Sequence, residues 1–520
     1  MSEQLALLPA YLTGHLQITL LALLLATIVS VPLGIAATRI AWLERVALTM
    51  TSAIQTIPGL ALLAVMVPLL AALGLPSIGY LPAIVGLTLY ALLPILRNTA
   101  TGIEGVDPSL IDAARGVGMT PRQQLLRVEI PLAAPVIVAG IRTATVWTVG
   151  MATLATPVGA ISLGNYIFSG LQTRNLAAVL IGSAASAALA LVLDGLVRMV
   201  ETGVRRRRRP LVAAGGALAA LLYGYAALAA LPALHRERTI VIGAKPFTEQ
   251  LVLAEILSVW IGQQTHRSTR ILPALGSTVA FDALKAGEVD VYVDYSGTLW
   301  TTILRGAELP QRREQLLEQM RARLRSEHGV TLAAALGFEN AYVLAIRESE
   351  AALRDIARIS DLKPLAPTMS MGADYEFFSR PEWRRLQELY GLRFAAQRTM
   401  DPSLLYPAAA RGDVDVVTAY SSDGRLETAR LRVLEDDLAA IPPYDAVILV
   451  GGQLAERDPE VLRALAALEN GIDVTTMQRM NLAVDANGYS PAQVAGNFVR
   501  GWRPRPTPRA DLPSEPPGPP

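Results

Sequence analysis

The sequence contains no cysteine. This absence excludes disulfide bonds, thiolate nucleophiles and cysteine-ligated zinc sites. Histidine is also scarce, and the four residues His15, His235, His266 and His328 are scattered without metal-ligand spacing. No glycine-flanked serine of the nucleophile-elbow type is present. These absences argue against an enzyme.

Lysine is almost absent as well, and occurs only as Lys245, Lys285 and Lys363. A phosphate-binding loop needs a lysine that follows glycine and precedes serine or threonine. None of the three lysines follows a glycine, so we expect no ATP-binding site in this sequence. The net charge is only +1, which gives no overall field for nucleic acid or acidic partners.

What the sequence has in excess is apolar residues. Hydrophobic residues make up 52% of the 520-residue chain, and they are concentrated before residue 234. A helix needs about 20 apolar residues to cross a bilayer. We predict six spanning segments, at Leu16–Ala37, Val46–Leu73, Leu81–Leu96, Leu132–Pro157, Leu176–Met199 and Leu211–Leu231.

The arginines between these segments predict their orientation. Arg39 and Arg45 lie in the first link, Arg97 to Arg127 in the third, and the run Arg205 to Arg209 in the fifth. The second link has no charge and the fourth has only Arg174. Because cytoplasmic links carry the excess of arginine, we expect the N-terminus and everything after the sixth segment to lie outside. The arginine run is also compatible with a nucleic-acid patch, but its place between two spans favours a topogenic anchor.

The long third link has a pattern of its own. Asp107-Pro108 predicts a helix start, Gly116 and Gly118 predict its end, and Pro131 precedes the fourth span. A surface amphipathic helix would fit this pattern.

A more specific interpretation comes from the EAA loop of binding-protein-dependent ABC importer permeases, which this link resembles. The resemblance is carried by Asp112, Ala113, Ala114, Gly118 and Pro131, with Asp112 where the family usually has glutamate. It implies a coupling helix that docks on a separate ATP-binding subunit. The segments Gln55–Leu62, Thr153–Ala155 and Gly164–Gly170 are similar to permeases for osmoprotectants such as glycine betaine, choline and carnitine.

The chain after residue 236 alternates short apolar strands with helices. This order is typical of parallel sheets covered by helices, with ligands at the carboxyl ends of the strands. Two similar units, around STVAFDALKAGEVD and SLLYPAAARGDVDVV, predict two lobes with a cleft between them.

Five motifs in this half resemble the quaternary-ammonium compound-binding proteins, which have a two-lobed type II periplasmic-binding-protein fold. They are Lys245–Gln250, Asp294–Thr298, Gly337–Tyr342, Ala419–Gly424 and Pro442–Ala446. Glu339 departs from the family pattern, which more often has an uncharged polar residue there.

A quaternary ammonium group has charge but no hydrogen-bond donor, so aromatic faces are its natural partners. Lys245 is expected to be exposed to solvent, and Tyr292 also fits a plain core residue. The predicted ligand-binding residues are Phe247, Thr248, Tyr292, Asp294, Tyr295, Ser296, Thr298, Glu339, Asn340, Tyr342, Tyr406, Tyr420 and Asp423.

The resemblances together predict an α-helical permease domain of about six transmembrane helices followed by an α/β type II binding domain. The expected boundaries are 1–205 for the permease, 206–236 for the sixth helix and tether, 237–502 for the binding domain and 503–520 for a disordered proline-rich tail.

The implied function is ATP-driven import of a quaternary-ammonium osmoprotectant across the bacterial plasma membrane. The resemblance implies a homodimer, a separate ATPase that holds ATP and magnesium, and no cofactor in this chain. Ergothioneine or a polar amino acid is the alternative cargo. A membrane receptor is the least favoured function, because no cytoplasmic output domain is present.

Overall fold

The computed structural model describes residues 2–172, 175–234, 239–245, 247–273, 275–306, 313–374, 377–400 and 402–502. The chain divides into two compact units, Met1–Leu251 with Arg270–Val289 and Val252–Thr269 with Asp290–Pro520. The predicted tail 503–520 and the end of the predicted tether lie outside the described residues.

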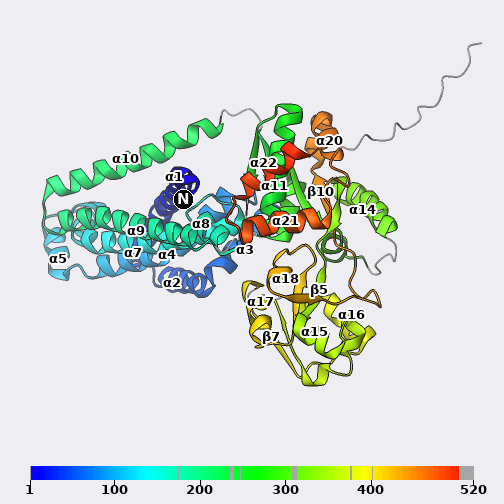
Figure 1. Cartoon of the computed structure of the whole chain (residues 1–520). Helices are drawn as coiled ribbons and strands as arrows, with labels where there is room; N and C mark the ends of the chain where they lie inside the picture. Colours follow the sequence, from blue (N-terminus) through cyan, green and yellow to red (C-terminus); the bar gives the residue numbers. More distant parts are fainter. Residues whose placement is uncertain are drawn as a thin grey trace, which may run out of the picture. The chain divides into compact units, whose positions relative to one another are not determined.

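The regular elements among the described residues of the N-terminal part are all helices (Figure 1). Among its described residues, five helices are long and apolar enough to cross a membrane, or six if a bent pair counts as one span. The elements are α1 (Ser2–Ala37), α2 (Ala41–Thr56), α3 (Gly59–Ala72), α4 (Tyr80–Glu104), α5 (Pro108–Gly116), α6 (Pro121–Gln124), the π-helix η1 (Leu125–Glu129), α7 (Ile130–Ala152), the 3₁₀ helix η2 (Thr153–Val158), α8 (Gly164–Gln172), α9 (Leu176–Arg205) and α10 (Arg209–Leu234).

The second predicted span, Val46–Leu73, is broken in the structure. Helices α2 and α3 meet at an angle of 105°. Ile57 is extended, with φ −71° and ψ 127°, because the ring of Pro58 disfavours helical geometry in the residue before it. Proline also has no N–H to continue the helix. The segment therefore forms two helices where the hydropathy pattern alone predicted one.

Close helix crossings hold the bundle together. A Cβ on Gly140 of α7 would lie 2.8 Å from the carbonyl oxygen of Pro94 in α4. A Cβ on Gly34 of α1 would lie 2.7 Å from the Cβ of Thr99, also in α4. Small residues at such crossings let helix backbones approach closely in a bilayer, so α4 is packed between α1 and α7.

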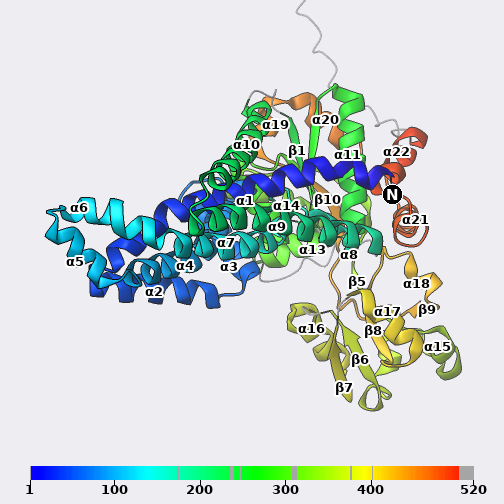
Figure 2. The same ribbon diagram turned by 90° about the vertical axis from the view of Figure 1, so that its left-hand side faces the viewer.

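The predicted helix start in the third link is confirmed. Asp107 caps α5 and accepts a hydrogen bond from the Ser109 N–H at 2.9 Å. The helix ends at Gly116, and Gly118 has φ +78°, a conformation that favours glycine. Figure 2 shows α5 and α6 at one end of the helix bundle. The link is thus a helix, a glycine turn and a second short helix.

The described residues of the C-terminal part form two five-stranded sheets. The first has the strand order β2-β1-β3-β10-β4 and the second β7-β6-β8-β5-β9. The strands are β1 (Ile240–Gly243), β2 (Thr269–Leu272), β3 (Val291–Tyr295), β4 (Thr331–Glu339), β5 (Tyr342–Arg347), β6 (Ser370–Ala373), β7 (Ala396–Thr399), β8 (Val416–Tyr420), β9 (Leu431–Val433) and β10 (Asp445–Val450).

Helices connect these strands. They are α11 (Thr248–Thr265), α12 (Ser277–Ala286), α13 (Ser296–Thr298), α14 (Arg313–His328), α15 (Glu348–Arg354), α16 (Pro381–Tyr390), α17 (Pro402–Arg411), α18 (Arg425–Thr428), α19 (Gly452–Arg457), α20 (Pro459–Ala466), α21 (Val474–Asp485) and α22 (Pro491–Gly501). Short single-turn segments lie at Leu299–Ile303, Ile359–Leu362, Ala366–Thr368 and Phe377–Ser379.

The two sheets are mixed rather than parallel throughout. β6 runs parallel to β7 and β8, but β5 is antiparallel to β8, and β10 is antiparallel to β3 and β4. β5 and β10 are the strands that enter each sheet directly from the other sheet, without an intervening helix. A direct connection does not impose the parallel direction that a helical crossover gives.

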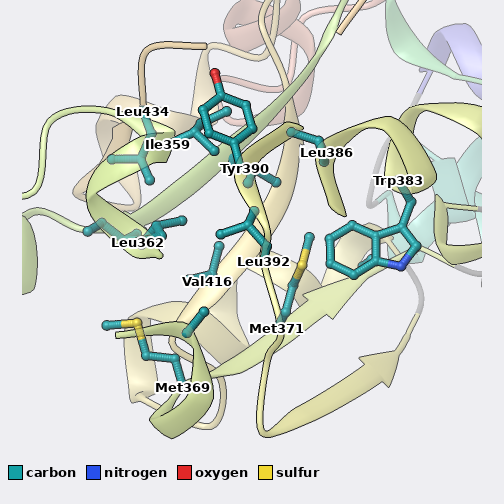
Figure 3. Close-up of a cluster of buried hydrophobic side chains, with 14 of the residues drawn as sticks. Ile359, Leu362, Met369, Met371, Trp383, Leu386, Tyr390, Leu392, Val416 and Leu434 are labelled. Atoms are coloured by element: carbon teal, nitrogen blue, oxygen red, sulfur yellow. The ribbon is translucent and has the colours of Figure 1, made fainter. Parts of the chain in front are cut away.

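The second sheet has its own hydrophobic core, shown in Figure 3. Trp383, Leu386 and Tyr390 of α16 pack with Met371 of β6 and Val416 of β8. This core fixes α16 and the segment before it against the carboxyl end of β6.

An acidic residue beside this core gives the fold a measurable pH dependence. Asp415 accepts hydrogen bonds from the N–H and the Oγ of Ser370 at 2.8 and 2.9 Å, and it pairs with Arg347. Burial acts to raise the pKa of Asp415, but these hydrogen bonds and the arginine hold it below its ordinary value.

Because the folded-state pKa is lowered, the ionised carboxylate stabilises the fold above the unfolded pKa, and this contribution is lost as the pH falls from about 4 through the folded value. We expect Asp415→Asn to cost about 1 kcal/mol at neutral pH and less in acid. Hydrogen exchange of the β6 and β8 amides measures the free energy of unfolding of the wild type and of Asp415→Asn. If the wild type exceeds the variant by the same amount at neutral pH and in acid, the prediction is wrong.

Candidate functional site

Two tyrosines from neighbouring strands form the centre of the candidate site. Tyr342 is the first residue of β5, and Tyr420 is the last residue of β8, opposite it in the antiparallel register. Their ring centroids are 4.9 Å apart and the rings are inclined by 38°. Phe377 lies on another side of Tyr342, with ring centroids 5.1 Å apart. Both tyrosines were predicted from the sequence, and the structure brings them together.

A buried carboxylate, Asp374, lies at the hydroxyl ends of these rings. Tyr342 Oη donates to Asp374 Oδ2 at 3.1 Å, and Tyr420 Oη lies 3.3 Å from the same oxygen. Burial raises the pKa of both phenols, and the nearby carboxylate adds to the shift. The hydroxyls therefore stay protonated. Phenols that donate to a carboxylate have more electron-rich rings, which strengthens their attraction for a cation.

Arg380 supplies a positive charge in the same place. Its guanidinium carbon lies 5.3 Å from the ring centroid of Tyr342. Its Nε and Nη2 lie 3.2 and 3.3 Å from the Glu382 carboxylate, and Nη2 donates to Tyr444 Oη at 3.3 Å. Burial acts to lower the pKa of Arg380, but Tyr444 and Glu382 more than offset it, so the pKa lies above its ordinary value.

Tyr444 completes this group. Its hydroxyl donates to Glu382, and its ring stands at 84° to that of Tyr342, with centroids 6.4 Å apart. The other side of the ring covers Gly297: a Cβ there would lie 2.6 Å from Tyr444 Cε1. Tyr444 thus joins the loop after β3 to the segment before α16.

Ser296, in α13 directly after β3, is hydrogen-bonded to the residues on both sides of Tyr444. The Oγ of Ser296 donates to the Pro443 carbonyl at 2.9 Å and accepts from the Asp445 N–H at 2.8 Å. Tyr295 is 5% exposed. Thr298 ends the short helix α13 and is half-buried.

Two other predicted residues lie inside β3. Tyr292 is fully buried, and its hydroxyl donates to Asp294 Oδ2 at 2.8 Å. Asp294 also accepts from the Tyr295 N–H at 2.7 Å. This geometry agrees with the interpretation of Tyr292 as a core residue.

The predicted residues at the end of β4 line the connection into β5. The backbone N–H of Asn340 donates to the Tyr444 carbonyl at 3.0 Å. The backbone carbonyl of Glu339 accepts from Ser421 Oγ at 3.0 Å. The backbones of Glu339 and Asn340 therefore tie the start of β5, where Tyr342 lies, to the segments of Tyr444 and Ser421.

Tyr406 and Asp423 form a separate cluster. Tyr406 Oη donates to Asp423 Oδ2 at 2.9 Å, and Arg425 pairs with that carboxylate. The guanidinium carbon of Arg425 lies 5.3 Å from the Tyr406 ring centroid. This cluster resembles the Arg380–Tyr342 pair in its geometry.

The first motif of the binding half is more buried than the sequence indicated. Lys245 is only 4% exposed, so the expectation that it faces solvent is wrong. Its backbone N–H donates to Gln250 Oε1 at 3.4 Å, within a tightly folded motif. Thr248 is 6% exposed and Phe247 is half-buried.

Sequence reasoning missed Asp374, Arg380, Glu382 and Tyr444 as site residues. Tyr444 stood in a family motif and could have been chosen. The other three lie just after β6 and before or in α16, where no local pattern marks them. Only the packing of α16 on β6 brings them to the tyrosines.

Four of the five predicted coupling residues are exposed, and Ala114 is buried. Asp112 pairs with Arg115 at 3.4 Å, with both side chains exposed, while Ala114 is 5% exposed. Leu110, Ala113 and Val117 of this region line a shallow groove with Val128 and Leu132. The groove is open and mostly apolar, and Arg127 and Arg207 also line it.

Known protein families match both halves of the chain. The family described as the binding-protein-dependent transport system inner membrane component matches residues 30–206. The substrate binding domain of ABC-type glycine betaine transport systems matches residues 238–501, half of the chain. The ergothioneine transport permease/ergothioneine binding protein EgtU of Helicobacter pylori is 30% identical over 459 residues, covering 86% of this chain and 81% of its own length.

The chain belongs to the binding-protein-dependent ABC transport family. It joins the permease and the substrate-binding domain, which are both non-enzymatic families, in one inner-membrane chain. The glycine betaine/carnitine/choline permease OpuCB of Bacillus subtilis is 44% identical over 195 residues, 37% of this chain and 87% of its own length.

The binding half of this ABC transport chain also has relatives of its own. The carnitine transport binding protein OpuCC of Listeria monocytogenes is 29% identical over 266 residues, 50% of this chain and 86% of its own length. A solved structure of a glycine betaine/carnitine/choline ABC transporter is 28% identical, with a TM-score of 0.45, covering 50% of this chain and 98% of its own.

The contact between Gly297 and Tyr444 gives a direct test of the site in this ABC transport chain. We expect Gly297→Ala to push the Tyr444 ring away and to weaken ligand binding about tenfold or more, because a Cβ would meet three ring atoms within 2.9 Å. Titration calorimetry with glycine betaine as the first ligand measures the affinity.

The matched control for this substitution is Gly262→Ala in α11, where the nearest atom would be 3.9 Å away. Equal affinities for the two alanine variants would show that the position of Tyr444 does not matter for binding.

Proposed function

We propose that this chain, together with a separate ATP-binding subunit, imports a quaternary-ammonium compound that also carries a carboxylate. The single observation behind this proposal is the half-buried guanidinium of Arg380, which lies over the ring of Tyr342 and donates to the hydroxyl of Tyr444. Aromatic faces attract a trimethylammonium group, and a guanidinium forms paired hydrogen bonds with a carboxylate. The two ends of a betaine need these two partners.

The geometry favours some of the expected cargoes over others. Glycine betaine and carnitine carry both a quaternary ammonium and a carboxylate, whereas choline has a hydroxyl in place of the carboxylate. A choline molecule would offer the guanidinium of Arg380 no carboxylate and would bring a second cation close to it. We therefore favour betaines with a carboxylate over choline.

Ergothioneine remains the second candidate cargo, because it too combines a trimethylammonium group and a carboxylate. The Helicobacter pylori relative named for ergothioneine matches both halves of this chain. A site that selects ergothioneine needs room for its thione ring beside the betaine group, while glycine betaine needs none.

Transport requires energy that this chain does not supply. The permease family works with a partner ATP-binding subunit, and we propose that ATP and magnesium bind there. The apolar groove along α5, with Ala113, Val117 and Leu132, would dock on that subunit. ATP-driven movement of this loop then opens the permease to the other side of the membrane.

The arrangement in the membrane follows from the arginine distribution. It favours a cytoplasmic α5–α6 link and a binding domain outside the cell. We further propose that two copies of this chain form the transport path, each with its own tethered binding domain. The tether raises the local concentration of the domain near the permease.

The binding domain by itself, residues 237–502, suits the decisive experiment, because relatives such as OpuCC match this half alone. We expect titration calorimetry to show tighter binding of glycine betaine, carnitine or ergothioneine than of choline. Arg380→Gln should weaken the preferred betaine by about 10- to 100-fold, since a charge-assisted hydrogen bond contributes about 1.5–3 kcal/mol. Choline binding should be unchanged or tighter.

The matched control is Arg425→Gln, because Arg425 also lies 5.3 Å from a tyrosine ring centroid and also pairs with a buried carboxylate. A loss of betaine binding in Arg425→Gln alone, in folded protein, would move the site to the Tyr406–Asp423 cluster. A wild-type domain that is folded but binds none of these compounds would refute the cargo assignment.

A further inference from the structure

A buried carboxylate lies where the α5–α6 link joins the membrane bundle. Glu129 is only 2% exposed and is the last residue of the π-helix η1, immediately before α7. An ionised carboxylate in such a place is costly unless it is paired. Its partner is therefore a structural requirement at this junction.

The partner comes from a different part of the chain. Arg39 Nη2 donates to Glu129 Oε2 in a close ion pair. Arg39 belongs to the short turn between α1 and α2, and its side chain is 52% exposed. The ion pair thus joins that turn to the base of the link, across 90 residues of sequence.

The helix at this junction is irregular. Residues Leu125 to Glu129 form a π-helix between α6 and α7. Such wide turns are uncommon and occur often at functional sites. The Ile130 N–H bonds to the Leu125 carbonyl, which carries the wide turn directly into α7. A single wide turn between two α-helices is a place where the direction of the chain can change without unfolding.

Apolar packing holds the neighbouring part of the bundle together. Ile103 of α4 and Ala133 and Ile137 of α7 form a buried cluster with Val31 and Ile35 of α1. The base of the link is therefore fixed to α1, α4 and α7 by packing, and to the α1–α2 turn by charge.

The turn that Arg39 occupies leads into the broken span. After it, α2 runs to Thr56, the chain bends by 105°, and α3 begins. Gln55, at the end of α2, donates to the Tyr90 carbonyl of α4 at 3.0 Å. A displacement of the α1–α2 turn therefore reaches the one bent span among the described helices.

We propose that Arg39 and Glu129 are positioning residues that transmit movement of the α5–α6 link to the α1–α2 turn and the bent span. They contact neither ATP nor cargo. Their ion pair makes the α1–α2 turn move together with the α5–α6 link when the ATP-binding subunit displaces that link. This inference rests on the docking of that subunit on the link, which belongs to the proposed function.

The test uses the full chain with its ATP-binding subunit in proteoliposomes, with glycine betaine uptake and ATP hydrolysis measured together. We expect Arg39→Gln to lower the uptake per ATP by about tenfold, within the 5- to 150-fold range usual for coupling between sites. ATP hydrolysis and co-purification of the subunit should persist. The charge exchange Arg39→Glu with Glu129→Arg should recover most of the lost uptake.

Arg45→Gln is the matched control, since Arg45 is an exposed arginine of α2 that carries the same charge change. If Arg39→Gln fails to fold, the double variant Arg39→Gln with Glu129→Gln replaces it, because two amides leave no buried charge unpaired. Uptake per ATP equal to wild type in that folded variant would overturn the inference.

Two further outcomes would also overturn it: an equal loss in Arg45→Gln, or a folded charge-exchange variant with no recovery. A wild-type complex that does not assemble or does not transport would instead refute the proposed function.

Discussion

The half-buried guanidinium of Arg380 is the constraint on which the candidate site depends. Its negative partner is the buried carboxylate of Glu382, from the first turn of α16. The same pair holds the hydroxyl of Tyr444, whose ring covers Gly297. The guanidinium carbon also lies 5.3 Å from the ring centroid of Tyr342. One charge therefore positions two tyrosine rings and the loop after β3, and Asp374 aligns the third ring through its hydroxyl.

This arrangement explains how one site can recognise both ends of a small zwitterion. The rings attract a methylated ammonium without offering it a hydrogen bond, and each contributes about 0.5–2 kcal/mol when water is excluded. The guanidinium attracts the carboxylate and repels a second simple cation. Selectivity would thus come from the combination of charges, and the aromatic residues alone would not separate a betaine from choline.

The permease half also contains a buried charged residue that is paired with a residue of opposite charge. Glu129 is paired by an arginine from a distant turn, and this ion pair adds a link to the α1–α2 turn where apolar packing already holds α1, α4 and α7 together. In both halves, then, a charge that cannot remain unpaired specifies which loops stay together.

Much of this architecture could be predicted from local sequence. Asp107, Gly116 and Gly118 marked the helix and turn of the α5–α6 link, because capping and positive φ depend on single residues. The sequence Ile57-Pro58-Gly59 indicates a break in the second span. The hydropathy pattern did not reveal it, because the residues on both sides are apolar.

The candidate site was less accessible to such reasoning. Tyr342 and Tyr420 were predicted from motifs at strand ends, but Arg380 and Glu382 reach them only through the packing of α16 on β6. Lys245 appeared exposed because lysine usually is, and only the fold shows its burial. Interactions between distant segments leave no local pattern, so charge pairs such as Arg39–Glu129 could not be predicted.

The most direct measurement is a crystal structure of the binding domain with glycine betaine. The account predicts the ligand carboxylate within hydrogen-bond distance of the Arg380 guanidinium, and the trimethylammonium group against the rings of Tyr342, Tyr420 and Tyr444. A ligand bound elsewhere, with Arg380 still paired only to Glu382 and Tyr444, would contradict it.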